Sequence, residues 1–211
     1  MKTLFIFLLV FFILEDSQTI THDNKLIYLI QYHCNKLNIT TKEEISLTIT
    51  GKMWKKAEEQ KEAIWRYYTK SETKLLFKDQ FSLGWLSTDT TGIIENDRRT
   101  WFHPPRNNQY FLTEIAPFPD FRKKCKVGDQ YSSIIFIGSG FGPWESKKVK
   151  SNYSITSIEK GIEDSLWKIK AISEIEGKTN RCEFIFSDKR GFILLSYAFF
   201  NGDSLTMKLE K

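Results

Sequence analysis

The last fifth of the chain constrains the fold most, because its apolar residues recur at every second position. Alternation of this kind predicts half-buried strands. The pattern runs through four segments, which are separated by turn residues at 176–178, 188–191 and 201–202. The dipeptide Asn201-Gly202 is typical of a type I′ hairpin turn. We therefore predict four antiparallel strands in a meander from about residue 165 to residue 210.

The strand predicted at 192–200 is apolar on both faces, which indicates a central position in a sheet. Bulky apolar side chains are frequent on these C-terminal strands, and their combined volume would allow a curved sheet to surround an apolar cavity. The residues expected to line that cavity are Phe184, Phe186, Phe192, Leu194 and Tyr197.

Alternation is also present in the first half of the chain. It predicts strands at 44–50 and 63–69, and it continues less regularly through 73–77 and 81–86. The charged residues 55–61 favour a long turn or a single helical turn.

The segment 23–37 differs, because Leu26, Ile30, His33 and Leu37 share one stripe at helical spacing. We expect a mainly β fold, a single antiparallel curved sheet or incomplete barrel, with this one short N-terminal helix packed on it.

The first 14 residues have the layout of a secretory signal peptide. Lys2 precedes an apolar run from Leu4 to Leu14, and a polar stretch follows. The run is too short to cross a bilayer as a helix, which needs about 20 residues. We expect residues 1–19 to be a signal peptide and 20–211 a single β-rich domain, secreted or periplasmic, with no membrane span after cleavage. An uncleaved signal anchor is the alternative.

Charge and cysteine content narrow the range of partners. The formal net charge is only +5, and acidic and basic residues alternate, so no nucleic-acid partner is expected. Three cysteines permit one disulfide, for which Cys125 with Cys182 is favoured, while three buried free thiols are the alternative. The cysteines and the three histidines are too widely spaced for a zinc site, and no motif for a cofactor is present. The oligomeric state is open.

Residues 96–129 are expected to form a long irregular loop, and loops of this length are usually functional or disordered. Their aromatic content argues against disorder. Arginine side chains bind carboxylates in a bidentate manner, and aromatic rings stack on flat apolar faces. The loop could therefore bind an apolar or sugar-like ligand. The candidate ligand-binding residues are Arg99, Trp101, His103, Arg106 and Tyr110.

Three functions remain open from the sequence. The first is an exported, non-catalytic binding or carrier module for an apolar or carbohydrate-like ligand. The second is an extracytoplasmic hydrolase in which His103 is the general base and Glu114 orients it. The third is an envelope protein that contacts other proteins through the aromatic loop. A purely structural role, in which the segment 96–121 plugs one end of the sheet, is the alternative to all three.

Overall fold

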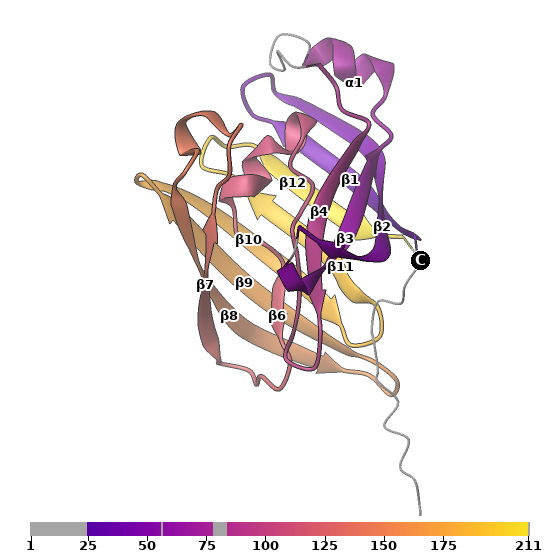
Figure 1. The fold of residues 1–211 in the computed structure, drawn as a ribbon, viewed down its shortest axis with the longest axis vertical. Helices are drawn as coiled ribbons and strands as arrows, with labels where there is room; N and C mark the ends of the chain where they lie inside the picture. Colours follow the sequence, from indigo (N-terminus) through magenta and orange to yellow (C-terminus); the bar gives the residue numbers. More distant parts are fainter. Residues whose placement is uncertain (1–24, 56, 78–83, 211) are drawn as a thin grey trace, which may run out of the picture.

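The computed structural model describes residues 25–55, 57–77 and 84–210, so the expected signal peptide at 1–19 lies outside the described part of the chain. The described residues form one antiparallel sheet that curls into a half-barrel (Figure 1). Its strands are β1 (Lys25–Cys34), β2 (Ile39–Trp54), β3 (Ala57–Tyr67), β4 (Thr88–Glu95), β5 (Arg99–Phe102), β6 (Asp120–Arg122), β7 (Gln130–Phe136), β8 (Lys148–Lys160), β9 (Ser165–Ile175), β10 (Lys178–Ser187), β11 (Gly191–Ala198) and β12 (Ser204–Leu209). The helices are α1 (Ser71–Leu76) and two short 3-10 helices, η1 (Asn108–Ile115) and η2 (Gly142–Trp144).

The first strand of the chain lies in the middle of the sheet, because β1 pairs with both β2 and β12. From there β2 to β6 extend the sheet on one side, and β11 back to β7 extend it on the other. In Figure 1 the indigo and magenta strands form one wall and the orange strands the other, with the yellow strands between them. The two edge strands, β6 and β7, are therefore consecutive in sequence and are joined by residues 123–129.

The predicted C-terminal meander is confirmed, since β9, β10, β11 and β12 pair in sequence order. The turn at Asn201-Gly202 has the predicted position but not the predicted type. Only Gly202 has a positive φ, at 88°, and Phe199 N donates to Asp203 O over 2.9 Å. This geometry is a type I turn followed by one left-handed glycine, which is a common longer hairpin connection.

The predicted helix at 23–37 is wrong, because residues 25–34 of this segment form the central strand β1. Its inner face is formed by every second residue, including Tyr28, Ile30 and Tyr32, while Leu29 lies on the outer face. Apolar residues also occur on the outer side, so the segment satisfied the helical spacing as well. The segment forms a strand and not a helix because it pairs with β12, which is distant in sequence.

Three smaller expectations also need correction. Residues 57–61 belong to β3 and not to a turn, and Thr50 Oγ1 donates to Glu62 Oε1 across the hairpin over 2.8 Å. The segment expected as a strand at 73–77 is mostly α1, which ends by placing Phe77 in the core. Of the strand expected at 81–86, residues 84–86 lie outside any strand and 81–83 fall outside the described residues.

The segment 96–129 was expected to be a long irregular loop. It contains three regular elements, β5, η1 and β6.

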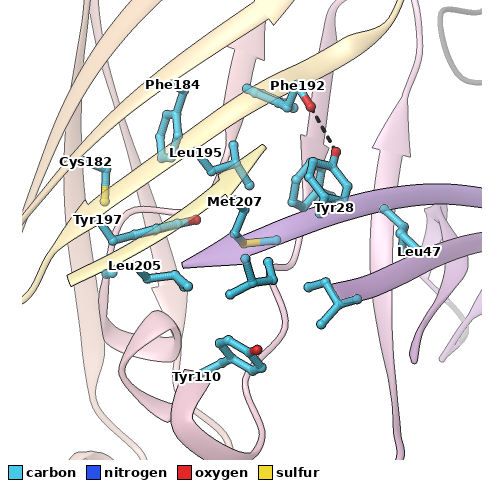
Figure 2. Packing of buried hydrophobic residues seen from close by; sticks show 14 of the residues in the cluster. Tyr28, Leu47, Tyr110, Cys182, Phe184, Phe192, Leu195, Tyr197, Leu205 and Met207 are labelled. Atoms are coloured by element: carbon cyan, nitrogen blue, oxygen red, sulfur yellow. Dashed lines mark hydrogen bonds between the residues drawn. The ribbon is translucent and has the colours of Figure 1, made fainter. Parts of the chain in front are cut away.

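On the concave side of the sheet, most of the side chains that were expected to line an apolar cavity belong instead to the packed core of the described residues. Phe184, Phe186, Phe192 and Tyr197 are each at most 1% exposed. Figure 2 shows Phe184, Phe192 and Tyr197 in one cluster with Tyr28 of β1 and Met207 of β12, and the Tyr28 hydroxyl donates to the Phe192 carbonyl oxygen over 2.9 Å. Leu194, also expected there, is only partly buried.

All three cysteines are free thiols, so the favoured Cys125–Cys182 disulfide does not form. Cys182 lies on the inner face of β10, where the carbonyl oxygen of Pro117 is 3.9 Å from its sulfur. Burial raises the pKa of its thiol well above the usual value. Cys125 lies in the connection between β6 and β7, and it is partly exposed. Among the described residues, no helix combines the length and the apolar composition needed to cross a membrane.

Candidate functional site

The segment from β5 to β6, residues 102–121, lies inside the curl of the sheet, and we call it the inner segment. Its main-chain carbonyls are bonded by side chains of the opposite wall. Tyr153 donates to the Phe118 carbonyl over 2.9 Å, and Ser173 and Asn180 donate to the Ile115 carbonyl over 2.8 and 3.0 Å. Buried carbonyls need such partners. The inner segment is therefore fixed on the sheet by specific bonds.

Arg99, a predicted ligand-binding residue, lies where the two edge strands meet. Its Nε atom is 3.8 Å from Asp120 Oδ1, and Arg122 Nε is 3.7 Å from Asp120 Oδ2. The Tyr131 hydroxyl of β7 donates to the Asp120 carbonyl of β6 over 2.5 Å. Burial raises the pKa of the Asp120 carboxyl, and the two arginines oppose this shift. Arg99 thus stabilises the junction of β6 with β7.

Trp101 is buried and does not present its ring to solvent. It packs against Phe118, with ring centroids 5.8 Å apart, and both belong to a small cluster with Ile94 that Ile135 of β7 covers. Trp101 is only 8% exposed, so its ring offers little surface to a partner protein. The expected interaction surface around Trp101 is therefore part of the protein interior.

Tyr110 is also a core residue rather than a ligand-binding one. It has no exposed surface, its ring stacks on Tyr67 at 5.6 Å, and its hydroxyl donates to Glu43 Oε2 over 3.2 Å. Gln109 Nε2 donates to the same carboxylate oxygen over 2.7 Å. Burial, and then the nearby Glu43 charge, raise the pKa of the Tyr110 hydroxyl.

His103 and Arg106 form a charged cluster with two carboxylates. Glu114 Oε2 is 3.0 Å from His103 Nε2, and its Oε1 is 3.7 Å from Arg106 Nη1. Arg106 Nε is 3.5 Å from Asp89 Oδ2. Burial raises the pKa of the Asp89 carboxyl, while Arg106 and then His103 oppose this shift. Arg106 thus lies between two carboxylates, with His103 beside it, near the start of β4.

The surroundings of His103 do not favour the expected role as a general base. Its Nδ1 donates to the Pro104 carbonyl over 2.9 Å, and its Nε2 contacts both Glu114 and Arg106. Its ring also packs on Phe118, with centroids 4.4 Å apart. A general base needs a free nitrogen within reach of the substrate proton. Whichever nitrogen carries the proton, both contact groups of the protein.

A pocket of about 710 Å³ lies beside this cluster at one end of the half-barrel. Its wall combines η1, the loop 138–142 and the turn between β11 and β12, and Figure 1 shows η1 and that loop side by side. The Phe111 and Phe141 rings stack with centroids 5.4 Å apart, and the Arg106 guanidinium lies 5.6 Å from the Phe141 centroid. The pocket thus offers two aromatic rings and one fixed cation.

Two buried acceptor oxygens belong to residues of this pocket. Gln109 Oε1 accepts no hydrogen bond from any described residue, and Asp89 Oδ2 has only the ion pair with Arg106 over 3.5 Å. Gln109 is 3% exposed and Asp89 is 9% exposed. Buried polar atoms without partners are uncommon in folded proteins, and each requires an explanation. Asp203, which also lines the pocket, is already bonded by the Tyr32 hydroxyl and the Asn35 amide.

Of the five predicted ligand-binding residues, only Arg106 lines the pocket, and His103 lies next to it. Sequence reasoning missed Asp89, Gln109, Phe111 and Phe141. One signal for Phe141 was present, because it lies between glycines at 140 and 142 whose φ angles are 93° and 56°. The sequence indicates a glycine bend there, and that bend brings the aromatic ring to the pocket.

No protein-family model and no curated protein sequence matches the chain. Three solved chains are similar to this one, two of them at 5% and 9% identity. One is a candidate exported protein with a YmcC-like fold from Bacteroides fragilis, with TM-score 0.40 and 5% identity over 90% of this chain and 97% of that one. The other is a candidate lipoprotein from Parabacteroides distasonis, with TM-score 0.43 and 9% identity over 93% and 99%. Function therefore rests on the chain's own residues.

Proposed function

We propose that the protein is an exported binding protein whose end pocket holds a carbohydrate-like ligand. The observation that carries this proposal is the pair of stacked rings of Phe111 and Phe141, which lie in a pocket wall that is otherwise rich in polar side chains. Sugar hydroxyls both donate and accept hydrogen bonds, so they suit those polar side chains. The apolar face of a sugar ring packs on an aromatic ring, so the pocket offers partners both to the hydroxyl groups and to the apolar face of a sugar.

The charge balance of the pocket favours a neutral ligand over an anion. Arg106 is the cation that faces the pocket, and Asp89 and Glu114 both lie within 4 Å of its guanidinium. An added anion would have to compete with these carboxylates. The same contacts hold Arg106 in one orientation, which lowers the entropy lost when a ligand binds.

The alternatives from the sequence have less support. A carrier for an apolar ligand needs room inside the sheet, but the inner face is packed with buried aromatic rings. The hydrolase lacks a free nitrogen on His103, and the interaction module would need the buried ring of Trp101. Export, as part of the proposal, is supported by the signal-like pattern of residues 1–19.

The test is binding to an array of neutral and acidic mono- to tetrasaccharides, followed by calorimetry with the strongest neutral sugar. Phe141→Ala removes one ring of the pocket, and Asp89→Asn removes the charge of one acceptor residue. We expect each to weaken binding by about tenfold or more, which corresponds to about 1.4 kcal/mol.

Tyr68→Ala is the matched aromatic control, because Tyr68 is 42% exposed and is not among the residues that line the pocket. It should bind like the native protein, and circular dichroism should show all three variants folded. Absence of binding to every sugar, or equal losses in Phe141→Ala and Tyr68→Ala, would refute the proposal.

A further inference from the structure

Among the described strands, β7 pairs only with β8, so one side of its main chain is not used in the sheet. Ile137 N donates to Lys147 O over 2.9 Å, so 137 and 147 are a hydrogen-bonded pair of the hairpin. Hydrogen-bonded and non-hydrogen-bonded pairs alternate along an antiparallel ladder. Residues 131, 133 and 135 therefore bond to β8. The N–H and C=O groups of Ser132, Ile134 and Phe136 point away from β8, toward the open edge of the sheet.

The same residues expose apolar side chains on the outer face. Ile134 is 64% exposed and Phe136 is 63% exposed, and Ile172 on β9 is 41% exposed on the same face. Single exposed apolar residues are ordinary on a protein surface. Here two of them coincide with the unpaired main-chain row, so a strand that pairs with β7 would also cover apolar surface.

Strand β7 lacks the features that usually protect an edge. Protected edges are short, charged, interrupted by proline or distorted by a bulge. The sequence of β7, QYSSIIF, has no charged residue and no proline, and its pairing with β8 has no register shift over seven residues. The other edge strand, β6, is only three residues long, and its Asp120 carbonyl already accepts the Tyr131 hydroxyl.

We propose that β7 pairs antiparallel with β7 of a second copy of this chain, joining two half-barrel sheets across a two-fold axis. A pairing centred on Ile134 places this residue opposite its own copy and Ser132 opposite Phe136 of the other subunit. No like charges face each other, because β7 has none. The three edge-facing residues of each strand would exchange about six hydrogen bonds. An uncharged, regular strand is complementary to itself, which favours a second copy over a charged peptide.

The expected interface is small, because each subunit contributes mainly one strand. Interfaces below about 1,200 Å² are typical of weak and transient complexes. We therefore expect a reversible dimer, with monomer at about 1 μM and mostly dimer near 1 mM, a range typical of weak association. The pocket lies at the end of the half-barrel and does not include any residue of β7, so dimerisation and ligand binding are separate properties.

Sedimentation velocity of the exported protein across this concentration range tests the proposal. Ile134→Lys places a charge at the centre of the pairing, and two such charges would face each other across the axis. Ser132→Pro removes one edge-facing N–H without affecting the bonds to β8. Each should raise the dimer dissociation constant at least tenfold. Ile172→Lys is the control, since Ile172 has similar exposure but lies two strands from the edge.

Dimer formation by the native protein and by Ile172→Lys, with loss in the two β7 variants, would support the pairing. Hydrogen exchange adds a site-specific result, because amides of Ser132, Ile134 and Phe136 should become protected only at the higher concentration. A protein that stays monomeric throughout, or a dimer unaffected by both β7 variants, would overturn the proposal. If Ile134→Lys failed to fold, Ser132→Pro and the hydrogen-exchange data would still test the β7 pairing.

Discussion

The bonds that hold the inner segment on the sheet allow a quantitative test. Asn180 has no exposed surface, its Nδ2 donates to the Ile115 carbonyl over 3.0 Å, and its Oδ1 accepts from Phe200 N over 3.1 Å. Asn180→Ala removes the bond to the Ile115 carbonyl, worth about 1 kcal/mol, and leaves Phe200 N without this partner at a cost of about 1–3 kcal/mol. We expect a loss of about 2–4 kcal/mol in the free energy of unfolding.

Ser173→Ala should cost less, about 1 kcal/mol, because the Ile115 carbonyl keeps its bond from Asn180. When both are replaced, that buried carbonyl loses both side-chain donors. The double variant should therefore be less stable than the sum of the single effects by about 1–2 kcal/mol.

Urea unfolding followed by tryptophan fluorescence gives all the free energies of this cycle. Thr156→Ala is the control, because Thr156 makes the same kind of bond, to the Lys168 carbonyl over 3.1 Å, at an exposed position. It should cost less than about 0.5 kcal/mol. If the Asn180 and Ser173 effects added to within about 0.5 kcal/mol, the shared carbonyl would not hold the inner segment, and the reasoning would fail.

Three further predictions concern stability, each measured by urea unfolding. Burial raises the pKa of Asp120, so its stabilising contribution is present at low pH and is lost as the pH rises through the folded-state pKa. Between about pH 4 and pH 7 the native protein should therefore lose more stability than Asp120→Asn does, and parallel pH profiles would argue against burial as the cause. Phe102 is 1% exposed between Trp65 and Phe192, so Phe102→Ala should cost about 3–5 kcal/mol, against less than about 1 kcal/mol for the exposed Phe136→Ala. Gly202 has φ 88°, and a Cβ there would lie 2.7 Å from Asn35 Nδ2. Gly202→Ala should therefore lower the free energy of unfolding by at least about 1 kcal/mol. The control Gly138→Ala should be nearly neutral, because no atom lies within 4 Å of a Cβ at that position.

The sequence predicted the C-terminal meander from about residue 165 to residue 210 best, because alternation and turn residues there agree and sequence neighbours pair. It failed for β1, whose apolar residues fit a helix and a strand equally well. What decides between them is pairing of Tyr28 with Leu209 and of Ile30 with Met207, about 180 residues away along the chain. Local patterns contain no information on such contacts.

The candidate site was less predictable than the fold. The sequence singled out His103, Arg106 and Glu114, and the structure does bring them together. It also assigned Arg99 and Tyr110 to the same surface, although they bond to Asp120 and Glu43 in the interior. The sequence around an arginine or a tyrosine does not show whether the side chain binds a ligand or makes a buried ion pair or hydrogen bond. Only the partner, which is distant in sequence, distinguishes a ligand-binding role from a structural one.

The pocket itself depends on three segments that have no periodicity in common: η1, the loop 138–142 and the turn around Asn201. Phe111 and Phe141 are 30 residues apart in sequence, and nothing local indicates that their rings stack. Glycines marked the loop as a bend, but the direction of Phe141 follows from where β7 and β8 lie in the curled sheet.

The central claim, that the end pocket binds a neutral carbohydrate-like ligand, is tested most directly by NMR titration with the strongest sugar from the array. We expect saturable chemical-shift changes concentrated in η1, in the loop 138–142 around Phe141 and in the turn around Asn201. Intermolecular contacts should join the sugar ring protons to Phe111 and Phe141. Titration without saturable shifts, or with shifts confined to the outer face of the sheet, would contradict the account.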